Sequence, residues 1–219
     1  MCAAPTACAP TIGQQAAIAR VAYALETPAA VALVCGPPGV GKTLVLVRIA
    51  EATALRGRRC VRRSLRTGLA DVTSVPPQGD AVLIVDDGHE ATAGELADVL
   101  EAWRRREPRG GVVLAGEGRL LTLVAQDVRI ERAVVLRATL GPFTRAESRE
   151  LVLSRGVSPG EVDDHDTVVR AIHEIAGGIP ARILQLADLV RMVAKAAPAG
   201  RITADDVEAL HRRLSLQAA

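Results

Sequence analysis

A glycine-rich octapeptide, GPPGVGKT, occupies residues 36–43 and carries the clearest chemical signal in the sequence. It fits the pattern G-x-x-x-x-G-K-[S/T], in which glycines let the backbone turn its N–H groups toward an anion. The lysine of this pattern reaches the β- and γ-phosphates of a nucleotide, and the next hydroxyl binds magnesium. The pattern therefore predicts a site for ATP with Mg²⁺.

The residues of this loop have three expected roles. Lys42 is the expected catalytic cation, and Thr43 is the expected magnesium ligand. A chance glycine-rich turn is the alternative, but an apolar strand before the loop and a helix after it disfavour that reading. The residues expected to contact the nucleotide are Gly36, Pro37, Pro38, Gly39, Val40, Gly41, Lys42, Thr43 and Leu44.

A second motif, AVLIVDD at residues 81–87, is an apolar run that ends in two carboxylates. Ligands of open α/β sheets bind at the carboxyl ends of the strands, so Asp86 is the expected partner of the magnesium ion. Asp87 stands where many ATPases place a glutamate that polarises the attacking water. Its side chain is one methylene shorter, so slow hydrolysis and a simple turn-capping role are both open, with Glu90 as a weaker substitute.

The elements that must position these residues follow from hydrophobic periodicity. Apolar runs predict strands at residues 29–35, 60–65, 81–85, 111–115 and 134–140. Helical spacing predicts helices at residues 11–27, 42–55, 90–107, 119–126, 145–155, 162–176, 181–196 and 204–216. A loop is expected at residues 67–79.

Strands that alternate with helices predict an α/β fold, a P-loop NTPase with a five-stranded parallel sheet sandwiched between helices. Every element expected after residue 141 is helical, which predicts a small C-terminal all-helical lid. The predicted organisation is a flexible tail over residues 1–13, an ATPase core over 14–141 and the lid over 142–219.

Composition sets the broad class of protein. The chain has 219 residues, 49% of them hydrophobic, and a net charge of +2, which is typical of a soluble globular protein and gives no general attraction to nucleic acid or membranes. No apolar run approaches the roughly 18 residues that span a bilayer, and the N-terminus lacks the features of a secretory signal. A cytoplasmic protein without a membrane span is expected. The four cysteines have no CxxC spacing, so neither a disulfide framework nor a zinc site is indicated.

Taken together, the motifs resemble the AAA-type ATPases of the general-secretion-pathway A (ExeA-like) family and their relatives in DNA transposition. The resemblance runs from about Gln14 to Leu214. It rests on the segments GPPGVGKT, VLIVDDGHE, VVLAGEGRL, LGPFTRAESRELVLSRG, GGIPARILQLAD and RITADDVEAL. The order and spacing of the later segments are more specific than the phosphate loop alone.

The resemblance implies further roles. Glu117 lies near the sensor-1 position, where the family commonly has a neutral polar residue, so a carboxylate there weakens direct sensing of the γ-phosphate. Arg182 is the nearest cation to the sensor-2 position, one residue later than the family pattern places it. Arg132 or Arg129 is the expected arginine finger toward a neighbouring subunit, with ordinary surface arginines as the alternative.

Two arginine clusters bear on partners. One consists of Arg56, Arg58, Arg59, Arg62, Arg63 and Arg66, and the other of Arg104, Arg105, Arg106 and Arg109. They leave duplex DNA open as a partner through phosphate contacts, with a solvated rim or a subunit interface as equal alternatives. The chain has only one Tyr, one Trp and one Phe, which disfavours base stacking on single strands.

Three functions remain in competition. The leading one is an ATPase that forms a homo-oligomer, ring or filament, and couples its ATP or ADP state to a partner complex of the secretion, pilus-assembly or DNA transposition type. The second is a nucleotide-gated switch or scaffold with little hydrolysis. The third is a small-molecule P-loop kinase, which the all-helical C-terminal third disfavours because it offers no evident acceptor pocket.

Overall fold

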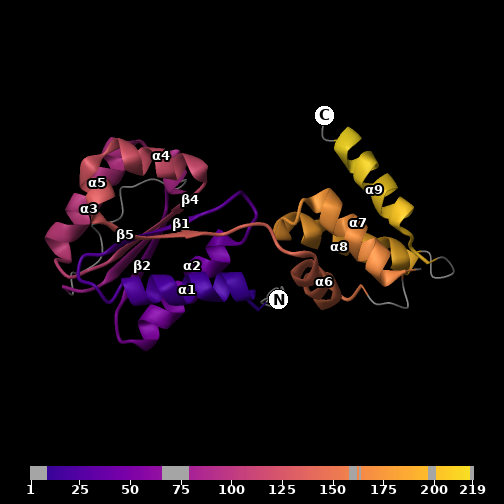
Figure 1. Ribbon diagram of the computed structural model, residues 1–219, viewed down its shortest axis with the longest axis horizontal. Coiled ribbons are helices and arrows are strands. Elements are labelled where there is room, and N and C mark those ends of the chain that lie inside the picture. The colour runs from indigo at the N-terminus through magenta and orange to yellow at the C-terminus, as the bar shows by residue number, and fades with distance from the viewer. Residues whose placement is uncertain (1–8, 66–78, 158–161, 163, 197–200, 218–219) are drawn as a thin grey trace. The chain divides into compact units, whose positions relative to one another are not determined.

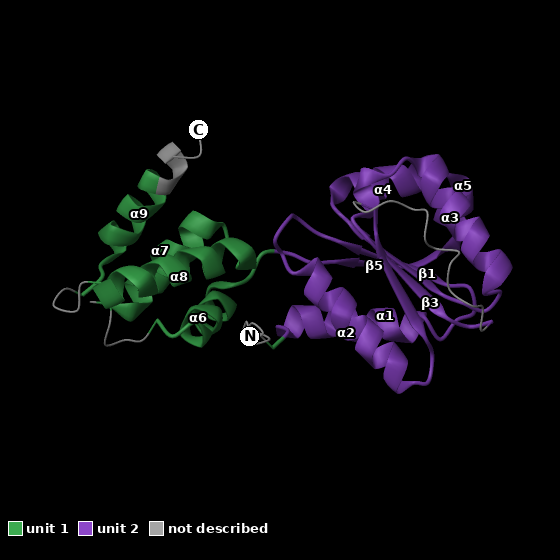
Figure 2. Cartoon of the chain, turned by 180° about the vertical axis from the view of Figure 1, so that it is seen from behind, with its two compact units in different colours: residues 1–9, 142–219 green, residues 10–141 purple. Residues whose placement is uncertain are grey.

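The computed structural model describes residues 9–65, 79–157, 162, 164–196 and 201–217, with side chains up to residue 213. The chain divides into two compact units, one of residues 10–141 and one of residues 1–9 and 142–219, which are coloured in Figure 2 and are described separately. Arg66, the predicted loop up to residue 78 and most of the predicted N-terminal tail lie outside the described residues.

A five-stranded parallel sheet forms the centre of the first unit (Figure 1). Its strands are β1 (Val31–Cys35), β2 (Cys60–Ser64), β3 (Val82–Asp86), β4 (Val112–Gly116) and β5 (Val134–Thr139). Their order across the sheet is β2-β3-β4-β1-β5. Every residue of β1 and β4 is buried, because strands in the middle of a parallel sheet are covered on both faces. The predicted five-stranded parallel sheet is therefore present.

Helices cover both faces of this sheet (Figure 1). Helices α1 (Ile12–Ala24) and α2 (Lys42–Leu55) pack on one face. Helices α3 (Ala93–Arg106), α4 (Gly118–Gln126) and α5 (Val128–Ala133) pack on the other. Because successive side chains of a strand point to opposite faces, Ala32 and Val34 of β1 join the core under α1 and α2, whereas Val31 and Leu33 join the core under α3 to α5.

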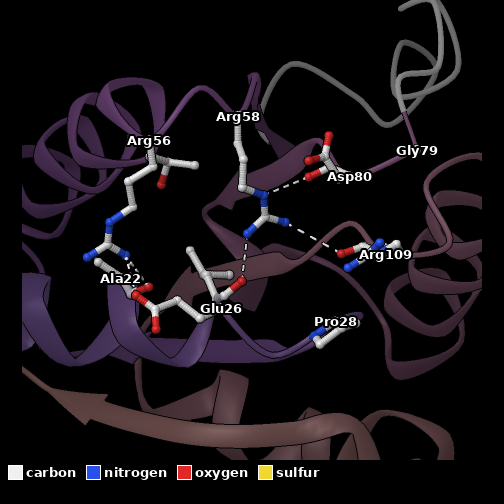
Figure 3. Close-up of a pocket in the computed structure, with 10 residues that line it drawn as sticks. Ala22, Glu26, Pro28, Arg56, Arg58, Gly79, Asp80 and Arg109 are labelled. Atoms are coloured by element: carbon white, nitrogen blue, oxygen red, sulfur yellow. Dashed lines mark hydrogen bonds and ion pairs between the residues drawn. The ribbon is translucent and has the colours of Figure 1, made fainter.

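Arg58, just before β2, ties together the amino ends of three other strands (Figure 3). Its guanidinium donates hydrogen bonds to the backbone oxygens of Leu25 at 2.6 Å, Asp80 at 2.9 Å and Arg109 at 3.5 Å. These oxygens lie in the segments that lead into β1, β3 and β4. Arg58 thus holds the amino edge of the sheet together, beside a cavity of about 550 Å³.

Replacing Arg58 by alanine is expected to lower the free energy of unfolding by about 2 kcal/mol, because a charged donor to three backbone oxygens is lost. Arg56 is the matched control. It bonds the Ala22 oxygen at 2.9 Å and Glu26 at 3.2 Å, but its side chain is half exposed, so Arg56→Ala should cost only about 0.5 kcal/mol. Urea unfolding followed by the fluorescence of Trp103, the single tryptophan, measures both. Equal losses would contradict the bridging role of Arg58.

The second unit is helical. It contains α6 (Arg145–Ser154), α7 (His165–Ala176), α8 (Pro180–Ala196) and α9 (Ala204–Gln217). A separate core holds these helices together, with fully buried side chains that include Val152, Ile172, Ile183 and Val207. Within the described residues, no helix of either unit is long and apolar enough to cross a membrane.

The predicted and observed elements differ mainly where short-range capping overrides periodicity. The helix expected at residues 90–107 is divided into a 3-10 turn, η2 (Gly88–Glu90), and α3, because Thr92 and Glu95 form a capping box that starts α3. The helix α5 was not expected, and Asp127 caps it. The helix expected from residue 162 begins at His165, because Asp164 caps it.

Candidate functional site

The phosphate loop lies at the carboxyl end of β1, where the connections of the sheet diverge. From β1 the chain runs through α2 to β2 at one edge of the sheet, while β5 lies on the other side of β1. Open α/β sheets bind ligands at such a switch point. Three carboxyl ends meet around the loop, those of β1, β4 and β3.

The glycines of the loop are required by its backbone. Gly39 and Gly41 have φ angles of 76° and 99°, which side-chain-bearing residues rarely adopt. Gly36 packs so closely that an added Cβ would lie 2.6 Å from the backbone oxygen of Leu140. Gly41 begins α2 without any side-chain cap, so the first N–H groups of the helix remain available to an anion.

Lys42 is nine-tenths buried at the start of α2. Its Nζ donates hydrogen bonds to the backbone oxygens of Gly36 at 2.9 Å and Pro37 at 3.0 Å. The ammonium group is thus held over the loop. Burial also raises the pKa of the neighbouring Cys35 thiol, against an opposing effect of the Lys42 charge.

Thr43 and Asp86 meet although they are 43 residues apart in the sequence. The Thr43 hydroxyl donates to the Asp86 carboxylate at 3.0 Å. A hydroxyl and a carboxylate are the hard oxygen donors that Mg²⁺ prefers, and Mg²⁺ usually takes only one or two protein groups together with substrate phosphates. The pair fits that requirement. Elsewhere among the described residues, no group of three or more His, Cys, Asp or Glu is arranged to hold a metal ion.

A cavity of about 380 Å³ opens between the loop and the ends of β3 and β4. It is lined by Pro38, Gly39, Gly41, Lys42, Thr43, Asp86, Asp87, His89, Glu90 and Glu117. Of the residues predicted to contact the nucleotide, Gly36, Pro37, Val40 and Leu44 do not line the cavity. Gly36 and Val40 are buried behind it and support the loop.

Asp87 is held by a residue that sequence reasoning did not single out. The Ser64 hydroxyl, at the end of β2, donates to the Asp87 carboxylate at 2.8 Å. Asp87 itself adopts a left-handed conformation with φ 57°, and its backbone N–H donates to Asp86 at 3.0 Å. It makes no side-chain cap to the turn that follows. The turn-capping alternative therefore has no support from these hydrogen bonds.

His89 is the second residue that was missed. Its Nε2 lies 3.6 Å from a carboxylate oxygen of Glu90 and 3.7 Å from one of Glu117. The Arg119 guanidinium donates to the His89 backbone oxygen at 2.8 Å. The only sequence signal was the position of His89 within VDDGHE, directly after the strand that carries Asp86.

A third missed residue, Gln14, supports the loop from α1. Its buried side chain donates to the Val40 backbone oxygen at 3.2 Å and accepts a hydrogen bond from the Thr11 N–H at 3.1 Å. The sequence signal for it was the Thr11-x-x-Gln14 capping box.

The structure separates the two finger candidates. Arg129 is bound to Asp127 at 2.7 Å and Glu101 at 2.8 Å, and these hydrogen bonds raise the pKa of its guanidinium. Arg132 is exposed and forms no ion pair or side-chain hydrogen bond with the described residues. It lies just before β5, at the amino edge of the sheet, whereas the cavity lies at the carboxyl edge.

None of the remaining predicted cations is among the residues that line the cavity. Arg182 is exposed near the start of α8, in the second unit, and its sensor role stays a prediction. Arg56, Arg58 and Arg109 lie at the amino edge of the sheet (Figure 3), where the first two bind the chain's own backbone.

Comparison with known proteins places the fold. No family model matches the chain, and no curated protein matches it. Among solved structures, the ORC2 protein of Aeropyrum pernix, with ADPNP and ADP, has a TM-score of 0.63 and 17% identity over 89% of this chain and 66% of that one. The Thermotoga maritima RuvB Holliday junction branch migration motor has a TM-score of 0.63 and 22% identity over 90% and 67%. A point mutant of that RuvB has a TM-score of 0.66 and 21% identity over 94% and 71%.

This chain thus spans about two thirds of the length of these structures. At such identities the likeness shows the fold alone, which is a P-loop NTPase fold with a helical C-terminal part. The predicted fold class, with its parallel sheet and helical C-terminal part, is confirmed.

Proposed function

We propose that this chain binds ATP with Mg²⁺, hydrolyses the β–γ anhydride slowly, and works as a homo-oligomer that couples its nucleotide state to a partner complex. The observation that carries the proposal is the meeting of Thr43 and Asp86 at 3.0 Å, beside a buried Lys42, in one cavity. These are the three side chains that a phosphate loop needs for a metal-bound triphosphate.

Each group has a distinct part in binding. The N–H groups of the loop and of the first turn of α2 face the phosphates, and the positive end of the helix favours their charge. Lys42 exchanges its contacts with the Gly36 and Pro37 oxygens for the terminal phosphates. Thr43 and Asp86 hold the magnesium ion, which supplies charge neutralisation at the phosphates when bound.

Assembly is the second part of the proposal. Arg132 lies at the amino edge of the sheet and cannot serve the cavity of its own chain, which opens at the carboxyl edge. An exposed arginine without a partner among the described residues of its own chain is suited to the nucleotide of a neighbouring copy. A ring or a filament provides that arrangement.

The proposed partner is given only as a class of complex. The resemblance to the general-secretion-pathway A family supports a secretion or pilus-type complex, and its relatives support DNA transposition. For duplex DNA, the exposed Arg62, Arg105 and Arg109 are available for phosphate contacts. One specific observation favours a nucleotide-gated switch with little hydrolysis as the second candidate. The carboxylate of Asp87 already accepts a hydrogen bond from the Ser64 hydroxyl, which competes with its use in polarising a water molecule.

Calorimetry and phosphate release on the purified chain test this proposal. We expect uptake of ATP in the presence of Mg²⁺, slow release of phosphate, and a larger particle mass with a slowly hydrolysed ATP analogue than without nucleotide. ATP uptake without phosphate release would favour the switch. A rise in turnover on adding duplex DNA would identify DNA as the partner. Failure of the folded chain to take up ATP would overturn the proposal.

A further inference from the structure

Five helices of the described chain begin with a side-chain cap, whereas the two α-helices that begin at the nucleotide cavity do not. Helices α1, α3 and α6 begin with capping boxes at Thr11, Thr92 and Thr144, and Asp127 and Asp164 cap α5 and α7. The two α-helices that begin at the cavity, α2 and α4, have no side-chain cap. Glu117 stands at the cap position of α4 and bonds none of its N–H groups, although it lines the cavity. Its side chain therefore has no capping role.

The register of the sheet places Glu117 beside the phosphate loop. It directly follows Gly116, which pairs with Cys35, and the N–H of Gly36 donates to the Gly116 oxygen at 3.2 Å. Strand β4 also pairs with β3, which ends in Asp86. Glu117 thus lies between the loop and the magnesium carboxylate, whereas Asp87 follows β3, one strand farther from the loop.

The two carboxylates also differ in their partners. Asp87 has the shorter side chain, and its carboxylate already accepts a hydrogen bond from the Ser64 hydroxyl at 2.8 Å. Glu117 is one methylene longer, and its only ion-pair contact among the described residues is with His89, whose Nε2 lies 3.7 Å from it. His89 is well buried, with 16% of its side chain exposed, and Arg119 fixes its backbone. His89 therefore limits where Glu117 can move.

We propose that Glu117 is the carboxylate that orients and deprotonates the attacking water, and that His89 is its positioning residue; both assignments rest on the proposed ATPase function. A carboxylate beside a terminal phosphate repels its oxygens, so the favourable contact open to it is a hydrogen bond from a water molecule. In the step, the water oxygen bonds to the γ-phosphorus while the bond from that phosphorus to the β–γ bridging oxygen breaks. The proton of the water passes to Glu117, and the products are ADP and phosphate.

Three isosteric variants rank the candidate carboxylates: Glu117→Gln, Asp87→Asn and Glu90→Gln. We expect Glu117→Gln to lower turnover by at least about 100-fold while ATP uptake by calorimetry stays close to that of the unchanged chain. Nucleotide extracted from that variant should remain ATP when separated by chromatography. The fall in turnover of Asp87→Asn and of Glu90→Gln should each be smaller than that of Glu117→Gln by a factor of at least about ten. Because the Glu117 side chain caps no helix, the thermal unfolding of the Glu117→Gln variant should match that of the unchanged chain.

The positioning role of His89 is tested with variants of His89 alone and in combination with Glu117→Gln. His89→Ala should lower kcat by about tenfold with little change in KM, and His89→Gln, whose amide can still lie against Glu117, should recover most of the lost kcat. In the double variant with Glu117→Gln, removing His89 should cost nothing further, because the residue it positions is already lost. If the two changes lowered turnover additively in the double variant, the positioning role of His89 would be contradicted.

The outcomes separate this inference from the ATPase proposal. A chain that takes up no ATP overturns the ATPase proposal and this inference with it. A chain that takes up and hydrolyses ATP, but in which Asp87→Asn or Glu90→Gln costs as much as Glu117→Gln, overturns this inference alone. ATP uptake with no hydrolysis by the unchanged chain overturns it too, while leaving nucleotide binding intact.

Discussion

Replacing Lys42 by alanine is expected to weaken ATP binding by about 10²–10³-fold, because a buried ammonium that faces phosphates contributes several kcal/mol. In the structure its Nζ has only backbone oxygens as partners among the described residues, at 2.9 Å and 3.0 Å, so no carboxylate there competes with the nucleotide for the charge. Turnover should fall as well, since the same charge faces the γ-phosphate during hydrolysis. Calorimetry with ATP and Mg²⁺ measures the affinity, and phosphate release measures the turnover.

The control for this variant concerns the loop itself. Removal of the ammonium leaves the oxygens of Gly36 and Pro37 without their donor, so the loop could lose its shape. Lys42→Arg is the control because it keeps the charge and the donors. If both variants unfold at nearly the normal temperature and only Lys42→Ala binds ATP poorly, the loss of binding is due to the loss of the charge. Undiminished ATP uptake by Lys42→Ala would contradict the predicted site.

The parts of this site that the sequence predicted are those set by short-range patterns. The loop from Gly36 to Thr43 follows a buried strand and begins a helix, as its motif requires. The pairing of Thr43 with Asp86 was also foreseeable, because parallel strands bring their carboxyl ends to one edge. Continuous apolar runs marked the strands for the same reason, since a covered parallel sheet needs them.

The parts that were missed depend on the register between strands. Ser64 reaches Asp87 because Ser64 pairs with Asp86 across β2 and β3, and the sequence CVRRS of β2 does not reveal that pairing. His89 meets Glu117 only because β3 and β4 are neighbours, although the two residues are far apart in the chain. Pairing of this kind is decided by tertiary packing, which local patterns do not record.

The choice between the two finger candidates shows the same limit. In the sequence Arg129 and Arg132 are equivalent cations on one short segment. The structure binds Arg129 to Glu101, a residue of α3 that lies 28 positions away, and leaves Arg132 exposed. A cation that already has two carboxylate partners must break those contacts before it can act elsewhere. Arg132 has no such cost.

Replacing Arg132 by alanine is therefore expected to lower turnover by about 10³-fold or more, the range that an arginine finger contributes to phosphoryl transfer. ATP uptake should change little, because Arg132 lies at the far edge of the sheet from its own cavity. Arg129→Ala is the matched control on the same helix, α5. It loses only the ion pairs of a half-exposed arginine side chain and should keep nearly normal turnover.

Mixing two inactive variants distinguishes action on a neighbour from action within one chain. A chain with Lys42→Ala cannot use its own cavity but still presents Arg132, and a chain with Arg132→Ala has an intact cavity but no finger. If Arg132 serves the next copy, an equimolar mixture should recover turnover that neither variant shows alone, and the recovery should follow the appearance of the larger particle. A mixture that stays inactive although it assembles, or full turnover in Arg132→Ala alone, would contradict the role of Arg132. Because the two sites sit at opposite edges of the same parallel sheet, recovery would require that copies associate head to tail, the arrangement that generates rings and filaments.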